Sequence, residues 1–341
     1  MKKIIRQFSL TLPLMLLLQV SLHAQDDEVN VNVNKDGKET KYEFVKKKSV
    51  NKSYNVSASD KLNIQNSFGA VEVHTWDRNE IKVDVSVEVS ANSDALAQKI
   101  LDRISITDDQ SGKEISFKTN MKDINNSKGD KSNMTINYSI SMPTSNPLQV
   151  KNEFGKTIIP DFKGEVDLTS KFGKLETGNL SNVKNINVEF GKAKLGNIPG
   201  GNLSIKYSAA TITKLSGNVK VNLEFSSKVT LNLDNNLDAL DLKASYSTVN
   251  LKPLGELPAT YKVTTSFGSF KNRTAVKFTS DEDDDDEHGP RFDHEYNGKS
   301  GNGNIQIKVK SNFSTIILGE ASDSDFKDKE KNKSKNKSVS I

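Results

Sequence analysis

Hydrophobic and polar residues alternate in short runs along most of this chain, and each run ends in an aromatic residue followed by glycine or serine. In residues 166–177, for example, Val166, Leu168 and Phe172 share one parity, polar residues lie between them, and Gly173 follows. Successive side chains leave a strand on opposite faces, so strict alternation predicts a strand with one buried face. The pattern occurs nine times, at Phe68-Gly69, Phe154-Gly155, Phe172-Gly173, Phe190-Gly191, Tyr207-Ser208, Phe225-Ser226, Tyr246-Ser247, Phe267-Gly268 and Phe313-Ser314.

The aromatic residues from Phe154 to Phe267 follow one another at steps of 18, 18, 17, 18, 21 and 21 residues. A fixed period near twenty is typical of solenoids, in which stacked units share a core that no single unit can form alone. The sequence therefore predicts an all-β fold, a parallel β-solenoid of the β-helix kind with coils of about 18–21 residues. An antiparallel sandwich is the alternative, because its strands also recur at short intervals.

The aromatic residues have the same parity as the valines, leucines and isoleucines of their strands. This parity predicts that they stack in a ladder inside the solenoid, with the following glycine taking the positive φ of a tight bend. On this interpretation Phe190→Ala opens a core cavity and costs roughly 3–5 kcal/mol.

Two segments interrupt the repeats. In the first, residues 77–146, Ser93 can cap a helix whose apolar face is formed by Leu96, Ile100 and Ile104. Strand patterns flank this helix on both sides. We expect a small α+β elaboration inserted after the first repeat, or an N-terminal cap that covers the open sheet edge of the solenoid.

The chain is divided accordingly into five predicted parts. They are a signal peptide (1–24), a polar, disordered or edge-forming segment (25–54), the first repeat with the α+β cap (55–150), the solenoid repeats (151–320, with an acidic insertion at 271–302), and a disordered lysine-rich tail (321–341).

The first 24 residues resemble a secretory signal. Lys2, Lys3 and Arg6 precede an apolar run that is too short for a membrane span, and Leu22-His23-Ala24 forms a cleavage site. The chain contains no cysteine, which excludes a bacterial lipoprotein anchor and leaves stability to apolar stacking. Removal of this segment leaves a nearly neutral protein, which argues against nucleic-acid binding. We predict an exported protein that is not integral to the membrane.

Several motifs together resemble the "putative adhesin" family of unknown function, whose members are secreted bacterial proteins common in the Bacteroidota. They are Asn-Ser-Phe-Gly-x-Val-x-Val-x-x-Trp at 66–76, the helix at 93–104, Ile-x-Tyr-x-Ile-x-Met-Pro at 136–143, and the repeated Phe-Gly turns. The resemblance covers residues 55–320. It implies a β-solenoid exported to the envelope or cell surface, and it supplies no catalytic residues.

No catalytic motif is evident in the sequence. His74 lies opposite the apolar face of its strand and is predicted to face solvent. A β-helix enzyme such as a polysaccharide lyase or glycosidase needs a close pair of outward carboxylates. The outward carboxylates are interleaved with lysine and asparagine, which favours a solvated mixed-charge face: Asp167, Glu176, Glu189, Glu224, Asp238 and Asp241.

The acidic insertion is the one stretch that suggests a ligand. Carboxylates favour Ca²⁺, and the two histidines are compatible with a transition metal. The candidate metal ligands are Asp283, Asp284, Asp285, Asp286, His288 and His294. The alternative is a solvated acidic loop, because the run lacks the glycine and asparagine spacing of known calcium loops. No other cofactor is predicted.

Taken together, the sequence predicts an exported, non-enzymatic, adhesin-like binding or scaffold protein of a Gram-negative envelope or cell surface. Its expected partner is a surface glycan or an envelope protein, and not nucleic acid. Two alternatives are a carbohydrate-active β-helix enzyme and a periplasmic component of envelope-stress signalling.

Overall fold

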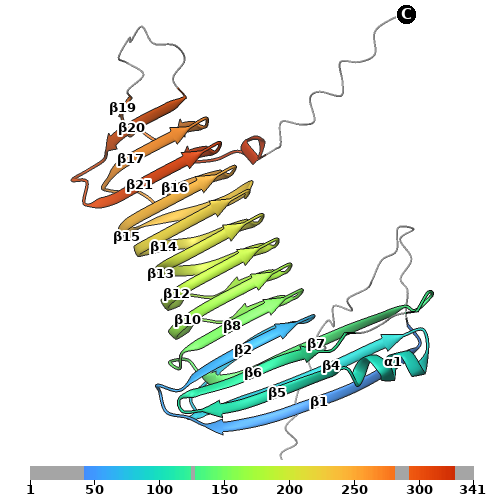
Figure 1. Cartoon of the computed structure of the whole chain (residues 1–341). Coiled ribbons are helices and arrows are strands. Elements are labelled where there is room, and N and C mark those ends of the chain that lie inside the picture. Colours follow the sequence, from blue (N-terminus) through green and yellow to red (C-terminus); the bar gives the residue numbers. More distant parts are fainter. Residues whose placement is uncertain (1–41, 124–126, 281–291, 327–341) are drawn as a thin grey trace, which may run out of the picture. The chain divides into compact units, whose positions relative to one another are not determined.

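A computed structural model describes residues 42–123, 127–280 and 292–326. The fold is all-β: its strands form one mixed parallel and antiparallel sheet (Figure 1), with a single α-helix and a short 3₁₀ segment in the described part of the chain. The N-terminal elements are β1 (Phe44–Asn55), β2 (Lys61–Ser67), β3 (Val71–Trp76), β4 (Glu80–Ala91), α1 (Asp94–Leu101), β5 (Ile104–Ser111), β6 (Glu114–Met121) and β7 (Ser132–Pro143).

The remaining elements are the stacked strands and the short segment after them. They are β8 (Leu148–Glu153), β9 (Lys156–Ile159), β10 (Phe162–Lys171), β11 (Lys174–Thr177), β12 (Leu180–Glu189), β13 (Lys192–Lys206), β14 (Ala209–Glu224), β15 (Lys228–Ser245), β16 (Thr248–Pro253), β17 (Ala259–Ser266), β18 (Ser269–Asn272), β19 (Phe278–Ser280), β20 (Asp293–Lys299), β21 (Ile305–Asn312), β22 (Thr315–Leu318) and the 3₁₀ segment η2 (Asp323–Phe326).

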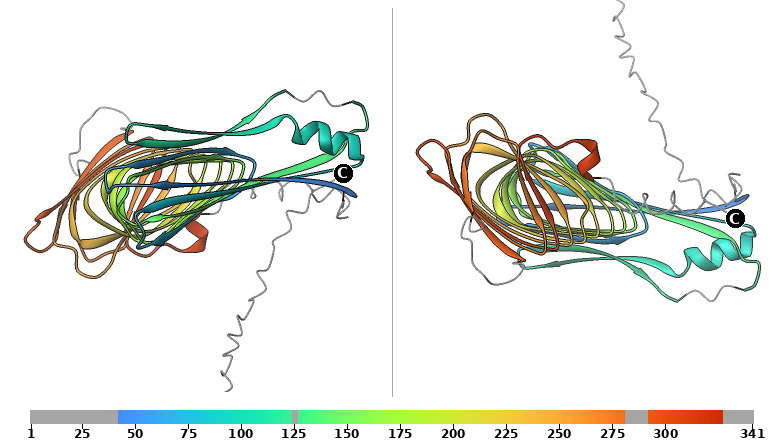
Figure 2. Two further views of the ribbon diagram at one scale, coloured as in Figure 1. Left: turned by 90° about the horizontal axis from the view of Figure 1, so that it is seen from below. Right: turned by 90° about the horizontal axis from the view of Figure 1, so that it is seen from above.

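Successive repeats pair in parallel, at the spacing of the aromatic residues. Leu168 pairs with Val150 on one side and with Ile186 on the other, and Ile186 pairs in turn with Leu203. All four side chains are buried, so the apolar face of each strand contributes to one continuous core. The strands of successive repeats lie one behind another when viewed along the stack (Figure 2). The sandwich alternative is wrong for these repeats, because its strands would pair antiparallel.

The order of strands in space departs from the order in sequence at the C-terminal end. The last long strand, β21, pairs in parallel with both β15 and β17 and therefore lies between them (Figure 1). In the same way β22 lies between β16 and β18. Beyond β17, β20 pairs antiparallel and β19 pairs with β20. The last repeat in the sequence is therefore an internal layer of the stack, enclosed by strands that precede it.

At the N-terminal end, the first repeat stacks directly on the second. β2 pairs with β8 and β3 with β9, although about 80 residues separate these strands in sequence. The intervening residues extend the sheet outward, through β6 and β5 on one side and through β7 and β4 on the other. β1, which precedes the first repeat, pairs with β4. Ser93 caps α1 by accepting a hydrogen bond from the Leu96 N–H, as predicted, whereas Ile104 begins β5 rather than extending the helix.

Side chains join the outermost strands β1 and β5. The Tyr54 hydroxyl donates to Asp108 Oδ2 at 2.5 Å, Lys52 Nζ lies 3.2 Å from the same carboxylate, and the ring of Tyr54 contacts Phe117 edge-on. Burial and the neighbouring Asp108 raise the pKa of Tyr54 to about 12. The second half of the polar segment predicted at 25–54 is thus a paired strand, and its lysines protect a sheet edge from further pairing.

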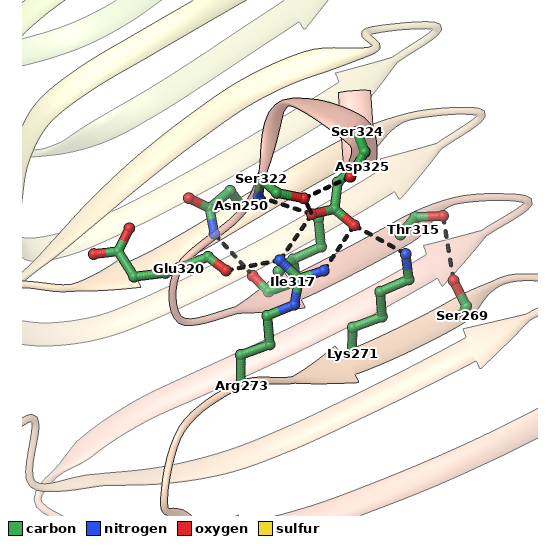
Figure 3. Close-up of polar contacts among 10 residues, drawn as sticks. All are labelled: Asn250, Ser269, Lys271, Arg273, Thr315, Ile317, Glu320, Ser322, Ser324 and Asp325. Carbon is green, nitrogen blue, oxygen red and sulfur yellow. Dashed lines mark hydrogen bonds and ion pairs between the residues drawn. The ribbon is translucent and has the colours of Figure 1, made fainter. Parts of the chain in front are cut away.

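The first residues of the predicted tail are also ordered. Asp325, in η2, accepts hydrogen bonds from Lys271 and Arg273 of the β18 region and from the Ser322 N–H (Figure 3). Its side chain is only 4% exposed, and the Arg273 guanidinium together with the Ser322 N–H holds the pKa of this carboxyl well below its usual range. The disordered tail predicted from residue 321 therefore does not include residues 322–326.

Candidate functional site: an exposed aromatic column

The aromatic residue of every repeat has a left-handed backbone conformation. The nine φ angles lie between 50° and 67°, a region that bulky side chains rarely adopt. The positive φ predicted for the following glycine is wrong: no glycine of the aromatic-small pairs has a positive φ. The bend is made by the aromatic residue itself.

This backbone conformation breaks the alternation of side chains. Along β10, Val166, Leu168 and Ser170 are buried, but the left-handed Phe172 after them turns outward. Phe172 is 49% exposed, and Phe190 is 48% exposed. The internal ladder predicted from parity is therefore wrong. The rings form a ladder as expected, but on the outside of the stack.

The rings stack in one unbroken series, which we call the aromatic column. Neighbouring centroids are 4.8–5.1 Å apart, and the angles between ring planes are 1–18°. Nine of the rings directly follow the last residue of a strand, and the tenth, Phe292, directly precedes β20. The centroid distances give the column a contour length of about 44 Å. Its ten members in spatial order are Phe68, Phe154, Phe172, Phe190, Tyr207, Phe225, Tyr246, Phe313, Phe267 and Phe292.

The residue after each aromatic is small because neighbouring repeats approach closely at this corner. A Cβ on Gly155 would lie 1.8 Å from the Gly69 carbonyl oxygen, and one on Gly173 would lie 1.9 Å from the Gly155 oxygen. Further along, serines replace the glycines, and each serine hydroxyl accepts a hydrogen bond from the N–H of the preceding repeat. These bonds run from Gly191 to Ser208, Ser208 to Ser226, Ser226 to Ser247 and Ser247 to Ser314, at 3.0–3.3 Å.

Stacking covers the ring faces and leaves the ring edges uncovered. Nine of the ten rings, all except Phe68, are 46–54% exposed. With about 200 Å² for each aromatic side chain, they present roughly 900 Å² of apolar surface in one line. The largest apolar patch of a typical soluble monomer is about 300–600 Å². The aromatic column is therefore the outstanding candidate for a contact surface in the described part of the chain.

Two rows of charged residues flank the column. The residues just before the rings alternate in sign, and two ion pairs join them: Lys171 to Glu189 and Lys206 to Glu224, both at 3.1 Å. We call this row the mixed flank. Its charged members are Glu153, Lys171, Glu189, Lys206 and Glu224.

On the other side of the column, three lysines occupy equivalent positions in consecutive repeats. Lys174 pairs in register with both Lys156 and Lys192, and we call these three residues the lysine row. A shallow depression lies between the column and two members of this row, Lys174 and Lys192. Its lining is Phe172, Gly173, Lys174, Phe190, Gly191, Lys192 and Tyr207.

The predicted site residues lie away from the column or outside the described residues. His74 is exposed on β3, as predicted. Asp283, Asp284, Asp285, Asp286 and His288 lie outside the described residues, so the metal site stays a prediction. His294 is half-buried in β20, opposite Thr265 of β17. No group of three metal-binding side chains occurs among residues 42–123, 127–280 and 292–326.

Several outward carboxylates are joined to lysines. Glu176 accepts hydrogen bonds from Lys174 and Lys156, which lower its pKa, and Lys206 lowers that of Glu224. The aromatic repeat is evident in the sequence, but the lysine row was not predicted from it. Its signal was a lysine two residues after the aromatic in three consecutive repeats.

No family model matches the chain, and a search of curated proteins found no match. The chain is similar to several solved structures. A putative adhesin from Bacteroides fragilis has a TM-score of 0.42 and 13% identity, over 80% of this chain and 97% of that chain. A putative cell adhesion protein from Clostridium sporogenes has a TM-score of 0.24 and 14% identity, over 81% and 100%. A putative lipid binding protein from Parabacteroides distasonis has a TM-score of 0.31 and 10% identity, over 80% and 97%.

Within the described residues, no helix has the length and apolar character needed to cross a membrane. The resemblance indicated by the sequence motifs is confirmed: putative adhesins of Bacteroidota are among the structures to which this chain is similar.

Proposed function

We propose that this chain is an exported, non-enzymatic binding protein of the adhesin-like kind, in which the parallel repeats form a β-solenoid that presents the aromatic column to a partner in the bacterial envelope or at the cell surface. The observation that supports this proposal is the roughly 900 Å² of aligned, exposed aromatic surface. A surface of this size is comparable to the area that one partner buries in a specific protein interface, about 800 Å².

The backbone conformation adds to this argument. A left-handed conformation costs a bulky residue roughly 1–2 kcal/mol, whereas glycine adopts it without strain and asparagine tolerates it. Nine aromatic residues nevertheless occupy such positions. Ring stacking offsets part of this cost, about 0.5–1.5 kcal/mol for each pair. Stacking alone does not require the ring edges to be uncovered, and a partner that covers them would account for their exposure.

The carboxylates support a binding role over a glycosidase. A glycosidase needs a general acid whose pKa is raised and a second carboxylate close to it. Within the described ranges, all carboxyl groups whose pKa is displaced have it lowered: Asp84, Asp108, Glu176, Glu224, Asp234, Glu295 and Asp325. Lowered values keep these groups ionised, which suits ion pairs rather than proton donation.

Co-sedimentation with an envelope fraction from the source bacterium tests the proposal. The test protein is the chain without its predicted signal peptide, and the test variant replaces Phe172, Phe190 and Tyr207 with asparagine. Asparagine tolerates a left-handed backbone, so the variant removes the ring edges at little cost in backbone strain. We expect wild type to sediment with the envelope fraction and the variant to lose most of this binding.

A matched control removes three exposed hydrophobic side chains away from the column, with the changes Val45→Asn, Met121→Asn and Leu254→Asn. These side chains are 40–45% exposed. The control is expected to bind like wild type. Equal loss in both variants, or no binding by wild type, would contradict a role for the column.

A further inference from the structure

We propose that the depression beside Lys174 and Lys192, together with the adjoining Lys156, binds a linear acidic polysaccharide, whose carboxylates lie against the ammonium groups of these three lysines. This inference rests on the proposed binding function and specifies the ligand class and the part of the column involved.

The lysine row places like charges next to one another. Lys174 is in register with Lys156 and Lys192, and like charges directly opposite on neighbouring strands are destabilising. Glu176 offsets part of this repulsion, with Lys156 at 3.0 Å and Lys174 also bonded to it. Lys192 has no ion pair within the described residues, and it is exposed. This side of the column therefore has an excess of positive charge that an anionic ligand would neutralise.

The depression gives an extended ligand access to these charges. Gly173 and Gly191 lie between ring and lysine in the depression, and Gly155 has the same place in the repeat of Lys156, so no side chain stands between ring and lysine in the sequence of these repeats. Ring edges are the electropositive part of an aromatic ring. Both walls of the depression are therefore favourable to anions, and the positions repeat at the ring spacing of 4.9 Å.

The stacked rings argue against recognition of neutral sugars along the column. Aromatic residues bind neutral sugars through their faces, and here each face in the middle of the column is covered by the next ring, at 4.9 Å or less for Phe190. Charge is the remaining source of affinity. The ligand inferred is therefore an acidic glycan.

The mixed flank argues against a lipid surface as the partner. A bilayer that meets the ridge of rings would contact both flanks in the same repeats. There the mixed flank presents Glu153, Lys171 and Glu189, which together are net negative. A polymer lying in the depression contacts only the lysine side.

Binding of polygalacturonate, an acidic polymer used as the probe, tests the inference, with neutral dextran and anionic phosphatidylglycerol vesicles as comparison ligands. The test variant is Lys156→Gln, Lys174→Gln and Lys192→Gln. The control variant, Lys151→Gln, Lys243→Gln and Lys310→Gln, changes the net charge equally on the strands that precede the rings, where all three lysines are exposed. Both variants are checked for an unchanged thermal transition.

We expect wild type to bind polygalacturonate but not dextran, with affinity that falls as salt is raised. The test variant is expected to bind about tenfold more weakly, and the control variant about as well as wild type. If polygalacturonate binding is weakened equally in the two variants, the inference is overturned. It is also overturned if wild type binds the vesicles but not polygalacturonate. Failure to bind polygalacturonate, with column-dependent envelope binding intact, would overturn the ligand class and leave the proposed function standing. If wild type binds neither polygalacturonate nor the envelope fraction, the ligand class and the proposed function are both overturned.

Discussion

Replacement of Phe190 by alanine and by glycine distinguishes an exposed left-handed position from a core position. Phe190 is 48% exposed and stacks between Phe172 at 4.9 Å and Tyr207 at 4.8 Å. About half of its side chain, ~100 Å², is covered by neighbours, which corresponds to about 2.5 kcal/mol of apolar burial. The loss of the two stacking contacts increases this cost, whereas the burial that the alanine side chain retains decreases it. We expect Phe190→Ala to lower the free energy of unfolding by about 3 kcal/mol.

Glycine is expected to be less damaging than alanine at this position. Both substitutions remove the ring, but glycine adopts the φ of 54° without the steric cost that alanine retains, roughly 1–2 kcal/mol. Phe190→Gly should therefore cost about 1 kcal/mol less than Phe190→Ala. In an ordinary strand position the order is reversed, because glycine there is less stable than alanine by roughly 0.5–1 kcal/mol.

Urea unfolding of the two variants measures this order, and Val188 provides the matched control. Val188 is fully buried in β12, two residues before Phe190, and its φ is not positive. We expect Val188→Gly to be less stable than Val188→Ala. If Phe190→Gly is also less stable than Phe190→Ala, the left-handed, exposed placement of the ring is refuted.

Three further predictions concern the corner, the C-terminal segment and the joined edge strands. Gly173→Ala would place a Cβ 1.9 Å from the Gly155 oxygen and should cost about 1–3 kcal/mol in urea unfolding; an unchanged midpoint would contradict the close approach. The pKa of Asp325 is lowered chiefly by Arg273, so its contribution is present above the unfolded value of 3.8 and is lost as pH falls below it. The difference in stability between wild type and Asp325→Asn should therefore shrink on acidification below about pH 4, and a constant difference would contradict the ion pair. The pKa of Tyr54 is raised from 10.0 to about 12, so its contribution is present below pH 10 and is lost as pH rises toward 12; Tyr54→Phe should flatten this part of the stability profile, and an unchanged profile would contradict the hydrogen bond.

The repeat and its parallel pairing followed from local patterns in the sequence. Val166 and Leu168 alternate with polar residues, and the step of 18 residues between aromatic residues is the same step that relates Leu168 to Val150 and to Ile186. The helix also followed from local signals, because a capping serine and an apolar face are encoded within a few residues.

The side on which the rings lie could not be predicted from alternation. Parity assumes that every residue is extended, and one residue with a positive φ reverses the direction of its own side chain. Phe172 shares the parity of Leu168 but points to solvent. Glycine is the usual residue with a positive φ, so Gly173 was the natural expectation. Glycine is needed at this position because it has no side chain, and the reason is the close approach of neighbouring repeats.

The order of the last strands depends on contacts between distant parts of the chain. The distance of 46 residues from Phe267 to Phe313 indicated an insertion, but not that β21 would lie between β15 and β17. Both edges of β21 are paired there, and β20 covers the outer edge of β17. The position of β21 between β15 and β17 therefore depends on contacts across the whole stack, and no local pattern in the sequence encodes it.

Chemical labelling of tyrosines tests whether the aromatic column is an exposed contact surface. A water-soluble tyrosine reagent is applied to the chain with and without the envelope fraction, and modification is read by mass spectrometry. Tyr207 and Tyr246 are 48% and 50% exposed, whereas Tyr138 is 1% exposed and serves as an internal control. We predict rapid modification of Tyr207 and Tyr246 in the free protein and their protection by the envelope fraction, with Tyr138 unreactive in both. Slow modification in the free protein would contradict the exposure of the column, and rapid modification in the presence of bound envelope would contradict its role in binding.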